Sequence, residues 1–109
     1  MNTYCMLYEL KPDCVEEYIR LHQNCPDYQI TALKDAGAEN LEIYIYNNYC
    51  IITYELNVTF AAFLDHLGRS EDNSRWQKMV DGMFVKKPAI TGQDQIQSLK
   101  KIFSLHKSV

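Results

Sequence analysis

Three stretches of the chain distribute their apolar side chains in the manner of β-strands. Residues 3–10 alternate between two faces, while residues 41–46 and 50–56 are rich in β-branched and aromatic side chains. Asn47 and Asn48 separate the last two stretches, and asparagine tolerates the positive φ of a tight turn. The pattern therefore predicts three strands, of which two are joined in a hairpin.

The segment between the first two predicted strands has helical spacing in two parts. Pro12 suits the start of a helix, whose inward stripe consists of Val15, Tyr18, Ile19 and His22. Pro26 interrupts this helix and can begin another, in which Ile30 and Leu33 are expected to face inward. Gly37 can end the second part as a left-handed cap. We therefore expect a broken first helix.

The second half of the chain predicts more helix and a last strand. Thr59 can cap a short helix that ends at Gly68. A further helix is marked by four residues expected to share one apolar face: Trp76, Met79, Val80 and Met83. Residues 88–97 have no consistent period and predict a loop. A short final strand is predicted by four apolar residues: Leu99, Ile102, Phe103 and Leu105.

The order β, α, β, β, α, β predicts an α+β protein. It is the order of a ferredoxin-like sandwich with an antiparallel four-stranded sheet, here formed by a single domain of residues 1–109. So few helices can cover only one face of the sheet, yet Leu41 and Ile43 alternate with Tyr44 and Tyr46, which places apolar or aromatic side chains on both faces. Because exposed apolar patches mark interfaces, we expect a homodimer packed through the sheet faces.

Composition narrows the classes of partner. The 109 residues include 47% hydrophobic and 23% charged side chains, as in ordinary globular domains. A net charge of -3 gives no basic field for nucleic acid or for a membrane surface, so neither partner is expected. The N-terminal residues do not resemble a secretory signal, which favours a cytoplasmic protein. Four scattered cysteines predict unpaired thiols rather than a redox motif or a zinc site.

Tyr18 and His22 are the strongest candidates for chemistry. They lie four residues apart, so a helix places them on one face within reach of one ligand. Histidine transfers protons near neutral pH and a phenol orients hydroxyl groups, although from the helix alone simple core packing is the favoured explanation of the pair. A metal site with His22, Cys25 and Asp27 is not favoured, because Pro26 breaks the helix between them and no fourth ligand is apparent.

Trp76 is the third candidate. Its flat indole could stack on the C–H face of a sugar ring and donate one hydrogen bond. From the helix alone, burial against its other apolar residues is the favoured interpretation.

A series of short motifs runs in order from the first helix to the last. Its members are Pro12-Asp13, Glu16-Glu17-Tyr18, Arg20, His22, Leu33-Lys34, Gly37-Ala38, Asn40, Ile43-Tyr44, Trp76, Met79, Asp81 and Met83. In this series the chain resembles the L-rhamnose mutarotase family. The resemblance implies a dimeric ferredoxin-like α/β barrel that interconverts the α and β anomers of a free sugar without a cofactor.

The resemblance also implies roles for single residues. His22 corresponds to the proton donor of the family, and Tyr18 and Trp76 correspond to substrate-binding residues. Two further substrate-binding positions differ, because Leu41 stands where the family has a tyrosine and Arg75 where it has the first tryptophan of a pair. The expected activity is that of an aldose 1-epimerase type isomerase acting on L-rhamnose or a related 6-deoxy sugar.

Two other functions remain open at this level. A small dimeric α/β-barrel monooxygenase acting on an aromatic substrate would also use an apolar pocket with His22 and Trp76. A non-catalytic sugar-binding module is the second alternative, since Arg75 and Leu41 replace aromatic side chains.

Overall fold

A computed structural model describes residues 2–85 and 97–105. Its helices and strands are β1 (Asn2–Glu9), α1 (Val15–Gln23), α2 (Asp27–Asp35), β2 (Ala38–Tyr46), β3 (Tyr49–Leu56), α3 (Phe60–Gly68), α4 (Glu71–Val80) and β4 (Gln97–Ser98). Short 3-10 turns precede α1 and follow α4. Within the described ranges, no helix has the length and apolar character needed to cross a membrane.

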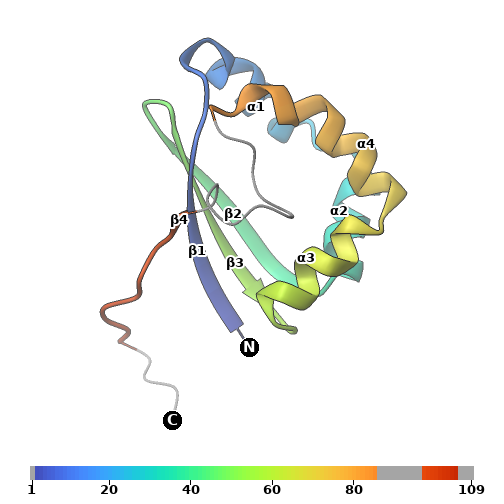
Figure 1. Ribbon diagram of the computed structural model, residues 1–109, viewed down its shortest axis with the longest axis vertical. Coiled ribbons are helices and arrows are strands. Elements are labelled where there is room, and N and C mark those ends of the chain that lie inside the picture. The colour runs from blue at the N-terminus through green and yellow to red at the C-terminus, as the bar shows by residue number, and fades with distance from the viewer. Residues whose placement is uncertain (1, 86–96, 106–109) are drawn as a thin grey trace.

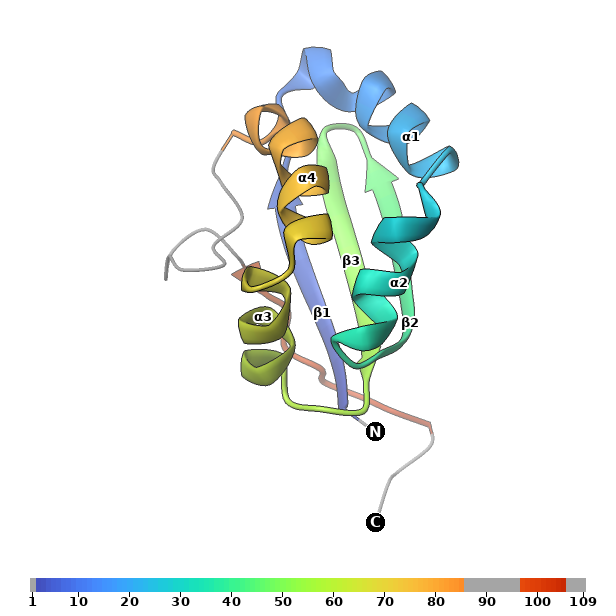
Figure 2. The same ribbon diagram turned by 90° about the vertical axis from the view of Figure 1, so that its right-hand side faces the viewer.

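The strands form one antiparallel sheet in the order β2-β3-β1-β4. Three strands are long and the fourth has only two residues. All four helices lie over one face of this sheet, as Figures 1 and 2 show. The α+β ferredoxin-like arrangement predicted from the order of elements is therefore confirmed, with each crossover built from two helices.

The local turn predictions are confirmed. Asn47 has a φ of 54° between β2 and β3, so it supplies the positive φ that the hairpin needs. Gly37 has a φ of 116° directly after α2, where a residue with a Cβ would be strained. Thr59 caps α3, because its hydroxyl oxygen accepts a hydrogen bond from the backbone N–H of Ala62 at 3.1 Å.

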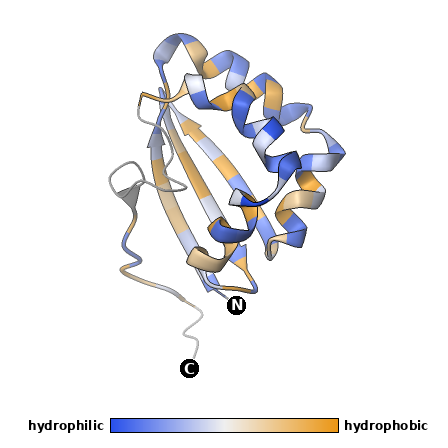
Figure 3. Ribbon diagram, turned by 45° about the vertical axis from the view of Figure 1, so that its right-hand side comes forward, coloured by the Kyte–Doolittle hydropathy of each residue, from blue (hydrophilic) through white to orange (hydrophobic). Residues whose placement is uncertain are grey.

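The core lies between the helices and the face of the sheet that they cover. Alternate residues of β1 and β3 point toward the helices, as strand geometry requires. In β1 and β3 these are Met6, Tyr8, Cys50, Ile52, Tyr54 and Leu56, and all are buried. Figure 3 shows this alternation as orange and blue bands along the strands.

None of the helices in the described residues lies on the opposite face of the sheet (Figure 1). Leu7 pairs with Ile51, and Ile51 pairs with Tyr44, so three apolar or aromatic side chains run across β1, β3 and β2. Tyr44 is exposed, while Leu7 and Ile51 are half-buried. We call the side of the sheet that bears these three residues the outer face.

The predicted final strand is wrong in position and length. Strand pairing involves Gln97 and Ser98, which face Leu7 and Met6 of β1, and residues 99–105 form no strand. Ile102 is 91% exposed, so its apolar character does not reflect burial in the sheet of one chain. The predicted loop at residues 88–97 falls almost entirely outside the described residues.

Two predictions about helix faces need correction. In α2, Leu33 packs against the core as predicted, but Ile30 is 39% exposed, and the fully buried positions are Gln29 and Ala32. In α4, Met79 is 42% exposed and points away from the buried face, which consists of Asn73, Trp76 and Val80. In both helices a polar amide occupies a buried position, so a search for apolar residues alone places the stripe incorrectly.

Candidate active site

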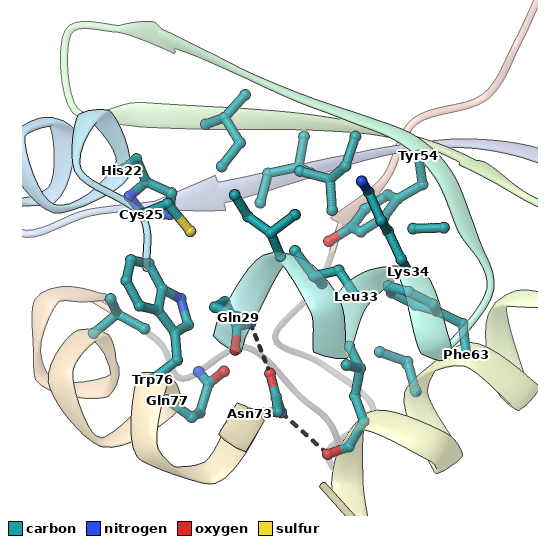
Figure 4. A pocket seen from close by; sticks show the side chains of 18 of the residues that line it. His22, Cys25, Gln29, Leu33, Lys34, Tyr54, Phe63, Asn73, Trp76 and Gln77 are labelled. Atoms are coloured by element: carbon teal, nitrogen blue, oxygen red, sulfur yellow. Dashed lines mark hydrogen bonds between the residues drawn. The ribbon is translucent and has the colours of Figure 1, made fainter. Parts of the chain in front are cut away.

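A cavity of about 520 Å³ lies between the covered face of the sheet and the helices. Figure 4 shows side chains from α1, α2, α4 and the strands converging on it. Much of its wall is apolar and includes Leu33, Leu41, Ile43, Ile52, Phe63 and Leu67. Small-molecule sites typically enclose about 300 to 1,000 Å³, so this cavity suits a ligand of modest size.

Tyr18 and His22 both line this cavity from α1. Their rings lie 4.1 Å apart between centroids. The Nδ1 atom of His22 lies 2.7 Å from the backbone carbonyl oxygen of Tyr18. A carbonyl oxygen only accepts hydrogen bonds, so Nδ1 carries the hydrogen and, in the neutral ring, Nε2 carries the lone pair. The helix therefore fixes which nitrogen of His22 can act as a base.

Burial sets the charge of His22. Desolvation lowers the pKa of His22 below its ordinary value of 6.5, and the hydrogen bond to the Tyr18 carbonyl opposes this only in part. Near neutral pH the imidazole is therefore mainly uncharged. Trp76 meets it edge to face, with ring centroids 5.0 Å apart and an interplanar angle of 88°. Trp76 is itself buried, so packing against His22 accounts for part of its role.

The hydroxyl groups of three tyrosines that line the cavity, together with the thiol of Cys50, form its main group of hydroxyl and thiol side chains. The thiol of Cys50 donates a hydrogen bond to the hydroxyl oxygen of Tyr18 at 3.5 Å, and the hydroxyl groups of Tyr8 and Tyr54 lie 3.0 Å apart. Burial raises the pKa of each of these four groups. They therefore stay neutral at physiological pH. All four described cysteines are free thiols, as predicted.

Gln29 and Asn73 add an amide pair that the sequence analysis missed. Gln29 Nε2 donates to Asn73 Oδ1 at 3.1 Å across the interface between α2 and α4, and both residues line the cavity. In the sequence, each is a polar residue at helical spacing from an apolar one: Gln29 lies four residues before Leu33, and Asn73 lies three residues before Trp76. Such positions are informative because buried polar groups require partners.

The structure brings four of the five predicted site residues together. Tyr18, His22, Leu41 and Trp76 line the cavity. Arg75 lies outside its lining and is exposed. Its guanidinium carbon lies 4.1 Å from the ring centroid of Tyr28, and its Nη2 atom lies 3.1 Å from Asp72 Oδ1. The Arg75 side chain therefore contacts Tyr28 of α2 and Asp72 of α4, and it does not point into the cavity. The described residues contain no group of three or more His, Cys, Asp or Glu side chains arranged to hold a metal ion.

The comparison with family models decides which proteins this chain is related to. The model described as L-rhamnose mutarotase matches residues 3–105. The chain belongs to this family. The L-rhamnose mutarotase family is a family of isomerases, and the match confirms the resemblance carried by the motif series around His22 and Trp76. No curated protein matches the chain in sequence.

Solved structures agree with the family in fold. An L-rhamnose mutarotase from Formosa agariphila superposes with a TM-score of 0.75 at 15% identity, covering 96% of this chain and 99% of that one. An antibiotic biosynthesis monooxygenase gives a TM-score of 0.59 at 11% identity, covering 94% of this chain and 99% of that one. A Mycobacterium tuberculosis protein gives 0.53 at 11% identity, covering 94% and 96%. At such identities the structures show that the chain has a fold of the dimeric α/β barrel type, but they carry no information about its substrate or activity.

Proposed function

We propose that this member of the L-rhamnose mutarotase family interconverts the α and β anomers of L-rhamnose or a related 6-deoxy sugar. The observation that carries the proposal is the hydrogen bond from His22 Nδ1 to the Tyr18 carbonyl, which leaves Nε2 as the atom that exchanges protons. The uncharged imidazole stands beside Trp76 in a cavity of suitable size.

One histidine nitrogen suffices for the proton transfers. Neutral His22 accepts the proton of the anomeric hydroxyl at Nε2, the C1–ring oxygen bond breaks with its electron pair passing to the ring oxygen, and the aldehyde forms. Both oxygens are bonded to C1, so the same Nε2 can return its proton to the ring oxygen. After rotation about C1–C2 the steps reverse on the other face of C1. The enzyme ends in its original protonation state.

Tyr18 and Trp76 would hold the sugar in this scheme. The Tyr18 oxygen already accepts a hydrogen bond from Cys50, so its own hydrogen is directed elsewhere and can be donated to a sugar oxygen. Trp76 offers apolar ring surface next to His22, where the C–H face of a sugar can pack.

Apolar walls suit a 6-deoxy sugar. Such a sugar has a methyl group where an ordinary hexose has a hydroxymethyl group, and burying a hydroxyl without a partner is costly. Leu41 and Ile43 of β2 supply apolar surface to the cavity. We propose that Leu41 alters the sugar preference from within the wall, and that Arg75 does so indirectly by holding Tyr28 on α2.

The second part of the proposal is a homodimer through the outer face. Leu7, Ile51 and Tyr44 form a continuous row there, and no described helix covers it. A second copy of the chain, packed sheet to sheet, would remove this row from water.

A monooxygenase is the second candidate function. The observation in its favour is the predominantly apolar cavity wall, which would also accept an aromatic substrate. Oxygen consumption with an aromatic substrate would distinguish it from the mutarotase, since anomer exchange consumes no oxygen.

The test is exchange NMR of the two anomers over a panel that includes L-rhamnose, L-fucose and D-glucose. We expect the unmodified protein to accelerate exchange of a 6-deoxy sugar above the buffer rate, and His22→Gln to lose at least about 100-fold of the enzymatic rate. His66→Gln is the matched control, because His66 is an exposed histidine on α3. No acceleration for any sugar would reject the proposal, and saturation transfer without acceleration would favour a non-catalytic sugar-binding module.

A further inference from the structure

The side chain of Gln29 presents a buried acceptor with no protein partner. Only 3% of this residue is exposed, and it lines the cavity. Among the described residues its Oε1 atom is the one buried side-chain nitrogen or oxygen without a hydrogen bond. An unsatisfied buried carbonyl oxygen lowers stability, so native proteins rarely retain one without a reason.

Neighbouring hydrogen bonds determine which way the Gln29 amide faces. Asn73 Nδ2 donates to the backbone carbonyl of Leu67 at 3.2 Å, and that carbonyl can only accept. Asn73 Oδ1 is therefore turned toward Gln29, and it accepts from Gln29 Nε2. This leaves Gln29 Oε1 on the other side of its amide group. The backbone carbonyl of Leu67 thus fixes the orientation of two side chains.

The helix start of α4 stiffens this arrangement. The hydroxyl of Ser70 accepts a hydrogen bond from the backbone N–H of Asn73 at 3.1 Å, so Asn73 belongs to the capped first turn of α4. Figure 4 shows Gln29 next to Asn73, with Trp76 and Gln77 on the adjoining part of α4. The acceptor is therefore held in place before any ligand binds, which reduces the entropy lost on binding.

We propose that Gln29 Oε1 accepts a hydrogen bond from one non-anomeric hydroxyl of the bound sugar. This inference rests on the proposed function, because the reacting end of the sugar is assigned to Nε2 of His22. Gln29, on α2, would bind a different part of the same sugar. A fixed acceptor in the cavity wall favours a hydroxyl at one ring position and disfavours sugars that lack a donor there. Gln29 is thus a specificity-determining residue for the sugar.

Deoxy and deoxyfluoro sugars test the proposal in the unmodified protein. The probes are the 2-, 3- and 4-substituted analogues of whichever of L-rhamnose and L-fucose exchanges faster, each corrected for its rate in buffer. Fluorine cannot donate a hydrogen bond, so at one position both analogues are expected to lose about tenfold in kcat/KM. If every deoxy and deoxyfluoro analogue keeps the kcat/KM of its parent sugar, the inference is overturned. That result would mean that buried water alone satisfies the Gln29 carbonyl.

Variants of Gln29 test whether this residue causes the dependence of kcat/KM on one sugar hydroxyl. In Gln29→Leu the tenfold loss at the sensitive position should disappear, because the parent sugar falls to the level of its analogues. Gln29→Met provides a second variant with a flexible side chain of similar length if the first is poorly folded. Gln77→Leu is the matched control, because it also removes an amide side chain from the cavity lining. Unlike Gln29, Gln77 already has a protein partner, since its Nε2 donates to Asp81 Oδ1 at 2.8 Å. An unchanged hydroxyl dependence in the folded Gln29 variants would overturn the inference.

Binding separates this inference from the proposed function. Saturation-transfer NMR with the same analogues measures recognition without catalysis. If the protein binds sugars but accelerates no anomer exchange, the mutarotase proposal fails while the hydroxyl dependence of binding still tests Gln29. If exchange is fast and no hydroxyl depends on Gln29, only the inference fails.

Discussion

His22 Nδ1 lies 2.7 Å from the carbonyl oxygen of Tyr18, one helical turn earlier in α1. The two residues are therefore in contact through the backbone hydrogen bond and through their rings, which are tilted by 37° with centroids 4.1 Å apart. The helix determines the tautomer of the neutral imidazole, and burial favours that neutral form. An imidazole nitrogen able to accept a proton is therefore present before any ligand binds.

The first prediction concerns the pH dependence of activity. Since Nε2 must be unprotonated to accept the anomeric proton, kcat/KM should be constant at and above neutral pH. It should fall at acid pH with an apparent pKa below 6.5, because burial lowers the pKa of His22. Exchange NMR from pH 4.5 to 8, with the buffer rate subtracted, measures this profile. An inflection above 7 would contradict a neutral, buried His22.

The same shift predicts how stability depends on pH. The unfolded chain takes up a proton at the ordinary histidine value of 6.5, whereas the folded chain takes it up only at lower pH. Between those two values the unfolded state binds more protons, so the free energy of unfolding falls as the pH falls through this window. Urea unfolding between pH 7.5 and 5 should show this decline in the unmodified protein. His22→Gln, which has no titrating ring, should show a smaller one.

Tyr18→Phe separates positioning from proton transfer. The variant removes a hydroxyl that accepts the hydrogen bond from Cys50, so we expect unfolding to become about 1 kcal/mol easier. We expect kcat/KM to fall about tenfold while the acid inflection of His22 remains. Tyr46→Phe is the control, because Tyr46 is 70% exposed. Loss of the acid inflection in Tyr18→Phe would contradict the assignment of this inflection to His22, because burial raises the pKa of the Tyr18 phenol and it cannot titrate at acid pH.

Local features of this fold could be predicted from the sequence because they depend on nearby residues. Asn47 and Gly37 mark turns that require positive φ, and both turns are present. The fourth strand could not be located, because two residues pair with the edge of β1 and the apolar residues that follow remain exposed. Long-range pairing of this kind leaves little signal in the strand's own sequence.

The candidate site shows the same division between local and distant information. Tyr18 and His22 could be paired from their helical spacing alone. The direction of the Arg75 side chain could not be predicted, because it depends on contact with Tyr28, a residue of another helix. Gln29 was missed because its burial depends on Asn73, a residue of another helix.

Gly37→Ala should destabilise the fold. A Cβ at this position would lie 2.6 Å from Val58 Cγ2 and 2.9 Å from Asn57 Oδ1, and the φ of 116° is unfavourable for alanine. We expect a loss of about 1 to 3 kcal/mol in the free energy of unfolding. Gly82→Ala is the matched control, since a Cβ there meets nothing within 4 Å. Equal stabilities of the two variants in urea unfolding would contradict this account.

The last prediction concerns the outer face. Ile51 pairs with Leu7 on one side and Tyr44 on the other, so it stands at the centre of the proposed interface. Ile51→Lys would bury a charge between two sheets, at a cost that an interface of this kind cannot offset. Light scattering coupled to size exclusion should therefore show a dimer for the unmodified protein and a monomer for this variant.

The control for the interface is Met79→Lys. Met79 is 42% exposed on α4, away from the sheet, so the same charge there should leave the dimer intact. Circular dichroism of the Ile51→Lys monomer would show whether the subunit stays folded without its partner. A monomeric unmodified protein at micromolar concentration would reject the sheet-to-sheet dimer. Because His22 and the cavity lie on the covered face of the sheet, that result would leave the proposed chemistry to be judged by anomer exchange alone.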